Sequence, residues 1–127
     1  MESIKRARPP KSRSPLTRLW NALFYSLNGI SAALRHEDAF RLEIILALVL
    51  VPIALQTPAS GLGKAVMIAS VLLVLIVELL NSAVEAVVDR ISLEDHVLAK
   101  RAKDMGSAAV MIALLNVPVV WLLILLP

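Results

Sequence analysis

The sequence predicts an all-α integral membrane protein that has an amphipathic surface helix and three transmembrane helices. Of the 127 residues, 58% are hydrophobic and the mean hydropathy is +0.78, whereas a soluble domain is typically about 45–50% apolar. The apolar residues come in three blocks, and the basic residues gather outside these blocks. The length is that of one domain. Three spans alone make a thin bundle, so a binding site between helices is easier to build in an oligomer.

The N-terminal part precedes the apolar blocks and divides into a tail and a helix. Residues 1–14 are basic and contain proline, so we expect a disordered tail. Residues 15–35 carry apolar side chains at intervals of three and four and polar ones on the other face. This pattern predicts an amphipathic helix that lies in the membrane interface. The basic cluster is typical of a cytoplasmic segment, and we expect no nucleic-acid partner.

The three apolar blocks predict the membrane spans of a single domain that covers residues 15–127. The expected spans are residues 39–55, 64–89 and 105–126. A turn-rich loop, 56–63, and a polar loop, 90–104, connect them. The second loop holds four basic residues and the first holds none. The N-terminus and the second loop should therefore be cytoplasmic, and the C-terminus should lie outside.

A stripe of polar residues marks the end of the second block. Glu78, Asn81, Glu85 and Asp89 are spaced three, four and four residues apart, which places them on one face of a helix. A carboxylate at the centre of a membrane helix costs roughly 2.5–3.5 kcal/mol on insertion scales, so the stripe predicts a functional site. Because about 20 residues cross the hydrocarbon core, Glu85 and Asp89 can reach the aqueous interface, with Glu78 about one turn deeper.

Other polar residues are expected on the same cytoplasmic side, and together they favour phosphoryl transfer. They are Arg18, Tyr25, Asn28, Glu37, Glu43, Lys103 and Asp104. Paired carboxylates suit Mg²⁺, which often takes one or two of them and shares phosphate oxygens. Lysine and arginine suit phosphates, and a carboxylate in a partly apolar site can accept a proton from a hydroxyl. These are the ingredients of phosphoryl transfer. The absence of cysteine excludes thiol chemistry.

Each of these residues also has a structural interpretation. Glu78 and Asn81 are candidates for hydrogen bonds between helices of an oligomer. Glu85 and Asp89 fit a solvated helix end, and Lys103 fits a positive-inside residue. The alternative from a different class is a non-enzymatic oligomeric membrane protein with an ion pathway. The third span and the outer half of the second offer almost no polar groups for such a path.

Three segments match a known family: EDAFRLE (37–43), VELLNSAVEAVVDR (77–90) and AKDMGSAAV (102–110). On these residues the chain resembles the small bacterial integral-membrane diacylglycerol kinases, which also include undecaprenol kinases. The resemblance implies ATP-dependent phosphorylation of a membrane lipid alcohol in the bacterial inner membrane. Diacylglycerol is the expected acceptor and phosphatidic acid the product, with undecaprenol as the alternative acceptor. A homotrimer with active sites shared between subunits, and Mg²⁺ as the cofactor, are implied too.

The resemblance also implies roles for individual residues. Glu78 corresponds to the general base, and Glu37 and Glu85 correspond to the magnesium ligands. The residues implied around the nucleotide are Arg18, Tyr25, Glu37, Asn81, Glu85, Glu94, Asp95, His96, Lys103 and Asp104. Those implied near the lipid substrate are Ser26, Glu43, Glu78 and Ser107. Leu27, where many members carry tryptophan, and Pro118 in the third span depart from the family pattern.

Overall fold

The computed structural model describes residues 14–91 and 96–127, and these residues form four helices and no strand. The helices are α2 (Pro15–His36), α3 (Asp38–Gln56), α4 (Gly61–Ile91) and α5 (Val97–Leu125). The predicted all-α class is therefore confirmed. The chain divides into two compact units, Met1–Ala32 and Ala33–Pro127. The second unit contains α3, α4 and α5, and each unit is described by itself.

Helix α2 has a capped start and an apolar face. The Ser14 hydroxyl accepts a hydrogen bond from the Thr17 backbone N–H at 3.3 Å, and Pro15 occupies the first helical position, where a missing N–H costs nothing. Its exposed large apolar side chains are Leu16, Leu19, Trp20, Leu23, Phe24, Leu27, Ile30 and Leu34. The amphipathic helix predicted for residues 15–35 is thus present, and its place in the membrane interface stays a prediction.

Glu37 separates α2 from α3. Glu37 has an extended backbone and is the N-cap residue of α3, without a side-chain capping hydrogen bond to any described residue. The Arg41 guanidinium pairs with Asp38 and donates to the carbonyl oxygens of Leu34, at 2.8 Å, and Arg35, at 3.1 Å. A cation therefore satisfies the last carbonyls of α2, where the helix dipole favours positive charge.

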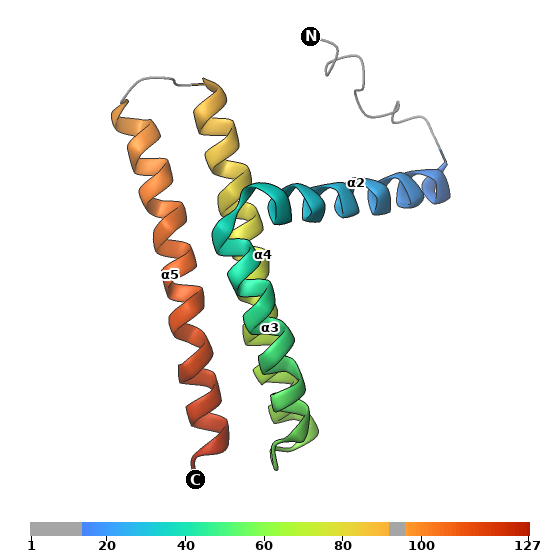
Figure 1. Ribbon diagram of the computed structural model, residues 1–127, viewed down its shortest axis with the longest axis vertical. Coiled ribbons are helices and arrows are strands. Elements are labelled where there is room, and N and C mark those ends of the chain that lie inside the picture. Colours follow the sequence, from blue (N-terminus) through green and yellow to red (C-terminus); the bar gives the residue numbers. More distant parts are fainter. Residues whose placement is uncertain (1–13, 92–95) are drawn as a thin grey trace. The chain divides into compact units, whose positions relative to one another are not determined.

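Helix α4 packs against both α3 and α5, and the three helices run alongside one another with alternating direction (Figure 1). The buried side chains of α4 recur at intervals of three and four residues. They are Met67, Ser70, Val71, Val74, Glu78 and Asn81. The polar stripe predicted from the sequence therefore lies on the same face of α4 as the buried residues nearer the start of that helix, which are mainly apolar.

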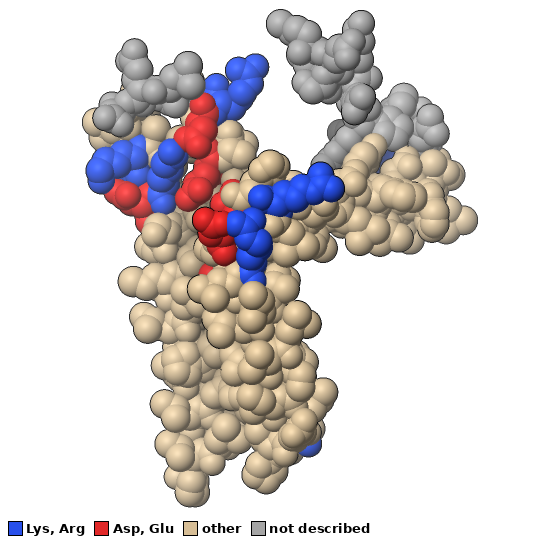
Figure 2. Space-filling model, viewed as in Figure 1, with Lys and Arg blue, Asp and Glu red and all other residues tan. Residues whose placement is uncertain are grey.

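Two described helices, α4 and α5, are long and apolar enough to cross a membrane. Helix α4 has 31 residues and is about 46 Å long at 1.5 Å per residue, whereas the hydrocarbon core is about 30 Å thick. One end of α4 must therefore leave the hydrocarbon. Charged side chains gather at the end where α4 finishes and α5 begins, and the opposite part is almost entirely uncharged (Figure 2). The first predicted span, residues 39–55 within α3, stays a prediction.

Helix α5 begins earlier than the sequence suggested. Residues 90–104 were expected to form a polar loop, but α5 begins at Val97. The His96 Nδ1 accepts a hydrogen bond from the Leu98 backbone N–H at 3.1 Å, which caps the helix. Lys100 and Asp104 form an ion pair of 2.7 Å at a spacing of four residues, which supports the first polar turns.

Hydrogen bonds also tie α5 to α4 in their apolar part. The Trp121 indole N–H donates to the Met67 carbonyl oxygen and to the Ser70 hydroxyl oxygen, each at 3.2 Å. The Ser70 hydroxyl in turn donates to the Met67 carbonyl oxygen at 2.6 Å. Polar groups surrounded by apolar side chains and lipid have few other partners, so these bonds hold the two helices in register.

We expect Trp121→Phe to lower the stability of the protein in detergent micelles. The phenylalanine ring fills most of the same volume but cannot donate the hydrogen bonds to α4, and such bonds between membrane helices are worth about 0.6 kcal/mol on average and at most about 1.7. Thermal unfolding measures the effect. Trp20→Phe is the matched control, because Trp20 lies exposed on α2 with its ring edge against Phe24. Equal losses for both variants would contradict the role of the indole N–H.

Candidate functional site

The polar stripe on α4 runs from buried to exposed positions. Glu78 is 5% exposed and Asn81 is 9% exposed, whereas Glu85 is half-buried and Asp89 is exposed. The Asn81 side-chain Nδ2 donates to Glu85 Oε1 at 3.3 Å. Exposure therefore increases from Glu78 toward Asp89, and the depth of Glu78 in the membrane stays a prediction. The stripe therefore extends along α4 from its charged end into the interior formed by α3, α4 and α5.

Helix α3 adds two carboxylates to this stripe. Glu43 is 7% exposed and lies in α3, and Glu37 is half-buried at the N-cap of the same helix. The negative charges of Glu37, Glu43 and Glu85 all act on the Glu78 carboxylate. Three predicted site residues are thus brought near Glu78, which is the most deeply buried carboxylate of the α4 stripe.

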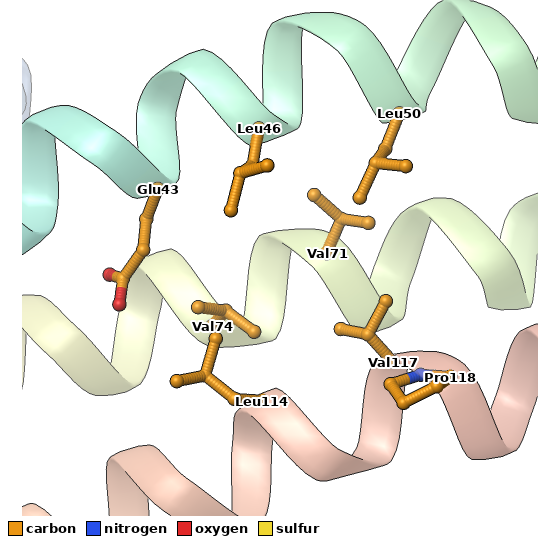
Figure 3. Close-up of a pocket in the computed structure, with 8 residues that line it drawn as sticks. All are labelled: Glu43, Leu46, Leu50, Val71, Val74, Leu114, Val117 and Pro118. Atoms are coloured by element: carbon orange, nitrogen blue, oxygen red, sulfur yellow. The ribbon is translucent and has the colours of Figure 1, made fainter.

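A cavity of about 170 Å³ lies beside Glu43, between α3, α4 and α5 (Figure 3). Its lining consists of Glu43, Leu46, Leu50, Val71, Val74, Leu114, Val117 and Pro118. The carboxylate of Glu43 is the only charged group in this lining. One of its oxygens, Oε2, is buried and has no hydrogen-bond partner among the described residues. The cavity therefore offers an apolar space with a single acceptor at one end.

The start of α5 contributes cations and a further carboxylate. Lys103 Nζ lies 2.5 Å from an Asp89 carboxylate oxygen, which links α5 to the end of α4. Lys100 and Asp104 form the ion pair already described. Ser107 is exposed and follows Asp104 by three residues, so both lie on one side of α5. Lys103 is thus brought to the polar stripe, and its role at a phosphate stays a prediction.

The remaining predicted residues lie in the other unit, at the cap of α5 or outside the described residues. Arg18, Tyr25 and Ser26 belong to α2 within Met1–Ala32, the unit that is described by itself. There Arg18 is exposed, Tyr25 is half-buried, and the Ser26 hydroxyl donates to the Ala22 carbonyl oxygen of its own helix at 2.8 Å. The His96 side chain caps α5. Glu94 and Asp95 lie outside the described residues.

Sequence reasoning missed the contacts between helices. The indole of Trp121 bonds to α4, and Arg41 binds the last carbonyls of α2. A signal for the first was present, because Ser70 is a hydroxyl within an apolar run. Its partner is 51 residues away in the sequence, and periodicity within one helix does not identify such a partner.

The donor set fits a magnesium ion that is held mainly by phosphates. The described residues contain no group of three or more His, Cys, Asp or Glu side chains that could hold a metal. Glu37 and Glu85 act on the same buried carboxylate, Glu78, and both carry hard oxygen donors. Mg²⁺ is commonly bound by one or two carboxylates together with substrate phosphates and water. The pair thus fits Mg²⁺ in that mode.

Comparison with known proteins agrees with this chemistry. A family described as "Prokaryotic diacylglycerol kinase" matches residues 24–125. A Pseudomonas aeruginosa protein named diacylglycerol kinase is 54% identical over 118 residues, which cover 93% of this chain and 96% of the relative. The proteins of that name from Haemophilus influenzae and Escherichia coli are 52% and 49% identical, over 84% and 86% of this chain and 90% and 89% of their own lengths.

Proposed function

Because the chain belongs to the prokaryotic diacylglycerol kinase family, we propose that it transfers the γ-phosphoryl group of ATP to the free hydroxyl of diacylglycerol. The product is phosphatidic acid. The observation that carries the proposal is the buried carboxylate of Glu78, on which three other carboxylates act. An acid so placed near the end of a membrane helix is suited to take a proton from a lipid hydroxyl.

Glu78 serves as the general base of this reaction. The lipid hydroxyl gives its proton to the Glu78 carboxylate, and the lipid oxygen forms a bond to the γ-phosphorus. The bond between the γ-phosphorus and the bridging oxygen breaks, and ADP leaves. The lipid is presented from the apolar side, where Glu43 and the adjoining cavity lie. Glu43 and Ser107 orient its headgroup, and Ser26 contributes from α2.

The nucleotide approaches from the charged end of α4 and α5. Glu37 and Glu85 would hold Mg²⁺, which when bound neutralises phosphate charge. Asn81 holds Glu85 through the hydrogen bond from Nδ2, and Lys103 offsets charge on the transferring group. The other nucleotide contacts come from Arg18, Tyr25, Glu94, Asp95, His96 and Asp104.

The protein is proposed to work as a homotrimer with three spans per chain, the first within α3, and active sites shared between subunits. It lies in the inner membrane with its N-terminus and the α4–α5 connection in the cytoplasm and its C-terminus outside. The basic residues on the two sides support this orientation. The many exposed large side chains of α5, among them Met111, Ile112 and Leu115, support contact with lipid or a second copy.

The decisive test is phosphorylation in mixed micelles. Purified protein is incubated with labelled ATP, Mg²⁺ and either diacylglycerol or undecaprenol. We expect labelled phosphatidic acid, and much less labelled product from undecaprenol. Preferential labelling of undecaprenol would change the acceptor but keep the reaction class. No labelled lipid from either acceptor would contradict the kinase proposal.

We expect Lys103→Gln to raise the KM for ATP by about tenfold, as loss of one charged contact to phosphate implies. Stability should change little, because a partly exposed ion pair is worth about 0–1 kcal/mol. Steady-state kinetics measures the effect. Lys100→Gln is the matched control, since Lys100 forms a similar ion pair one turn earlier on α5 but within its own helix. Equal KM values for the two variants would remove Lys103 from the phosphate site.

A further inference from the structure

The contact between α4 and α5 is unusually close at one glycine. A Cβ atom added at Gly106 would lie 2.1 Å from Asn81 Oδ1 and 3.2 Å from Asn81 Cγ. Real Cβ atoms essentially never come so close to another heavy atom, so a side chain at this position must displace Asn81. By contrast, a Cβ at Gly61 meets nothing within 4 Å, and one at Gly63 meets Ile124 Cγ2 at 3.1 Å, Ala59 Cβ at 3.3 Å and Ser60 Oγ at 3.4 Å.

The Asn81 side-chain amide directs its Oδ1 atom toward Gly106 and its Nδ2 atom toward the polar stripe. Its Oδ1 is buried without a hydrogen-bond partner among the described residues and points at the glycine, where only a Cα–H group is available. Its Nδ2 donates to Glu85 Oε1 at 3.3 Å. Because the amide group is planar, a shift of Oδ1 away from α5 must also move Nδ2 relative to Glu85.

We propose that Gly106 is a positioning residue for the phosphate site, acting through Asn81 on Glu85. Its lack of a side chain lets α5 approach α4 so that the Asn81 amide is clamped with its N–H groups toward the Glu85 carboxylate. The inference rests on the proposed function insofar as Glu85 is taken to hold Mg²⁺. The clamp itself follows from the contact between Gly106 and Asn81 alone.

Gly106→Ala should therefore weaken metal binding and lower thermal stability together. With Mn²⁺ as a paramagnetic stand-in for Mg²⁺ in the presence of ADP, we expect affinity to fall by about tenfold, the effect of losing one hydrogen bond to a charged group. In kinetics, the KM for MgATP should rise by a similar factor and kcat should fall less. Gly61→Ala is the control, because it makes the same substitution in open space on α4.

A double variant separates positioning from a general packing defect. Asn81→Ala removes Oδ1 and Cγ, so the nearest remaining Asn81 atom to a new Cβ at 106 is the Cβ of residue 81, at an ordinary 3.9 Å. Asn81→Ala combined with Gly106→Ala should thus match Asn81→Ala alone in melting temperature and in Mn²⁺ affinity. If Gly106→Ala alone fails to fold, recovery of a folded protein in the double variant supports the clamp.

Three results would overturn the proposal. One is a Gly106→Ala protein that melts and binds Mn²⁺ like Gly61→Ala. Another is a double variant in which the two losses add, or which stays unfolded when Asn81→Ala folds. The third is wild-type protein that binds no Mn²⁺ with ADP. Failure of the proposed function would show separately, as the absence of lipid phosphorylation by the wild-type protein.

Discussion

Glu78→Gln is expected to lower kcat for lipid phosphorylation by about 10²–10⁴-fold, the range that general base catalysis contributes. Glutamine keeps the size of the buried side chain and can still hydrogen-bond the lipid hydroxyl, but it cannot take the proton. Binding of ADP with Mn²⁺ should persist, because the phosphates are assigned to other residues. Steady-state assays and equilibrium binding on the same preparation measure the two effects.

The melting temperature of Glu78→Gln distinguishes catalysis from a structural role. Glu78 is 5% exposed, and the charges of Glu37, Glu43 and Glu85 act on it. Removal of one charge from such a group relieves repulsion, so stability should stay the same or increase. A buried glutamate whose charge lowers the stability of the protein in this way is typical of a functional site. A lower melting temperature or dissociation of the proposed oligomer would favour the alternative in which Glu78 holds helices together.

Glu43→Gln provides the matched comparison. Glu43 is also a buried carboxylate, 7% exposed, but it lies at the end of the apolar cavity. We expect this variant to raise the KM for diacylglycerol more than it lowers kcat. If Glu43→Gln abolishes turnover while Glu78→Gln spares it, the base is Glu43 and the assignment from the polar stripe is wrong.

The helices were predictable because each depends on local sequence. The spacing of Glu78, Asn81 and Glu85 predicted one helical face, and α4 carries all three on its buried side or at the edge of that side. Hydropathy was a poorer guide to where helices begin. It placed the beginning of the third apolar block at Met105, although the cap at His96 and the pair of Lys100 with Asp104 extend α5 toward the N-terminus through a polar stretch.

The contacts between helices were not predictable in the same way. The close approach of Gly106 to Asn81 and the bonds of Trp121 to α4 join residues far apart in sequence, and they depend on the rotation of one helix against another. Periodicity gives the face of a helix but not its partner. The individual catalytic roles came from resemblance to a family, and the structure adds the burial and charge environment that makes them testable.

Glu85→Gln is expected to lower kcat/KM for MgATP by about 10²–10³-fold, since a metal clamp on phosphates contributes several kcal/mol to the transition state. Glutamine can still accept the hydrogen bond that Asn81 Nδ2 donates to position 85. The loss therefore reports the missing charge rather than a broken contact. The Mg²⁺ concentration for half-maximal activity should also rise by at least about tenfold.

Asp89→Asn separates metal binding from general charge at this end of α4. It removes the same charge one turn further along, from a side chain that pairs with Lys103 at 2.5 Å. We expect it to alter the KM for ATP while leaving the Mg²⁺ requirement unchanged, because Asp89 is not one of the proposed metal ligands. A parallel rise in the Mg²⁺ requirement for both variants would mean that the helix end attracts cations collectively. Glu85 would then lose its specific role, and the ligands of the ion would have to be sought among other residues.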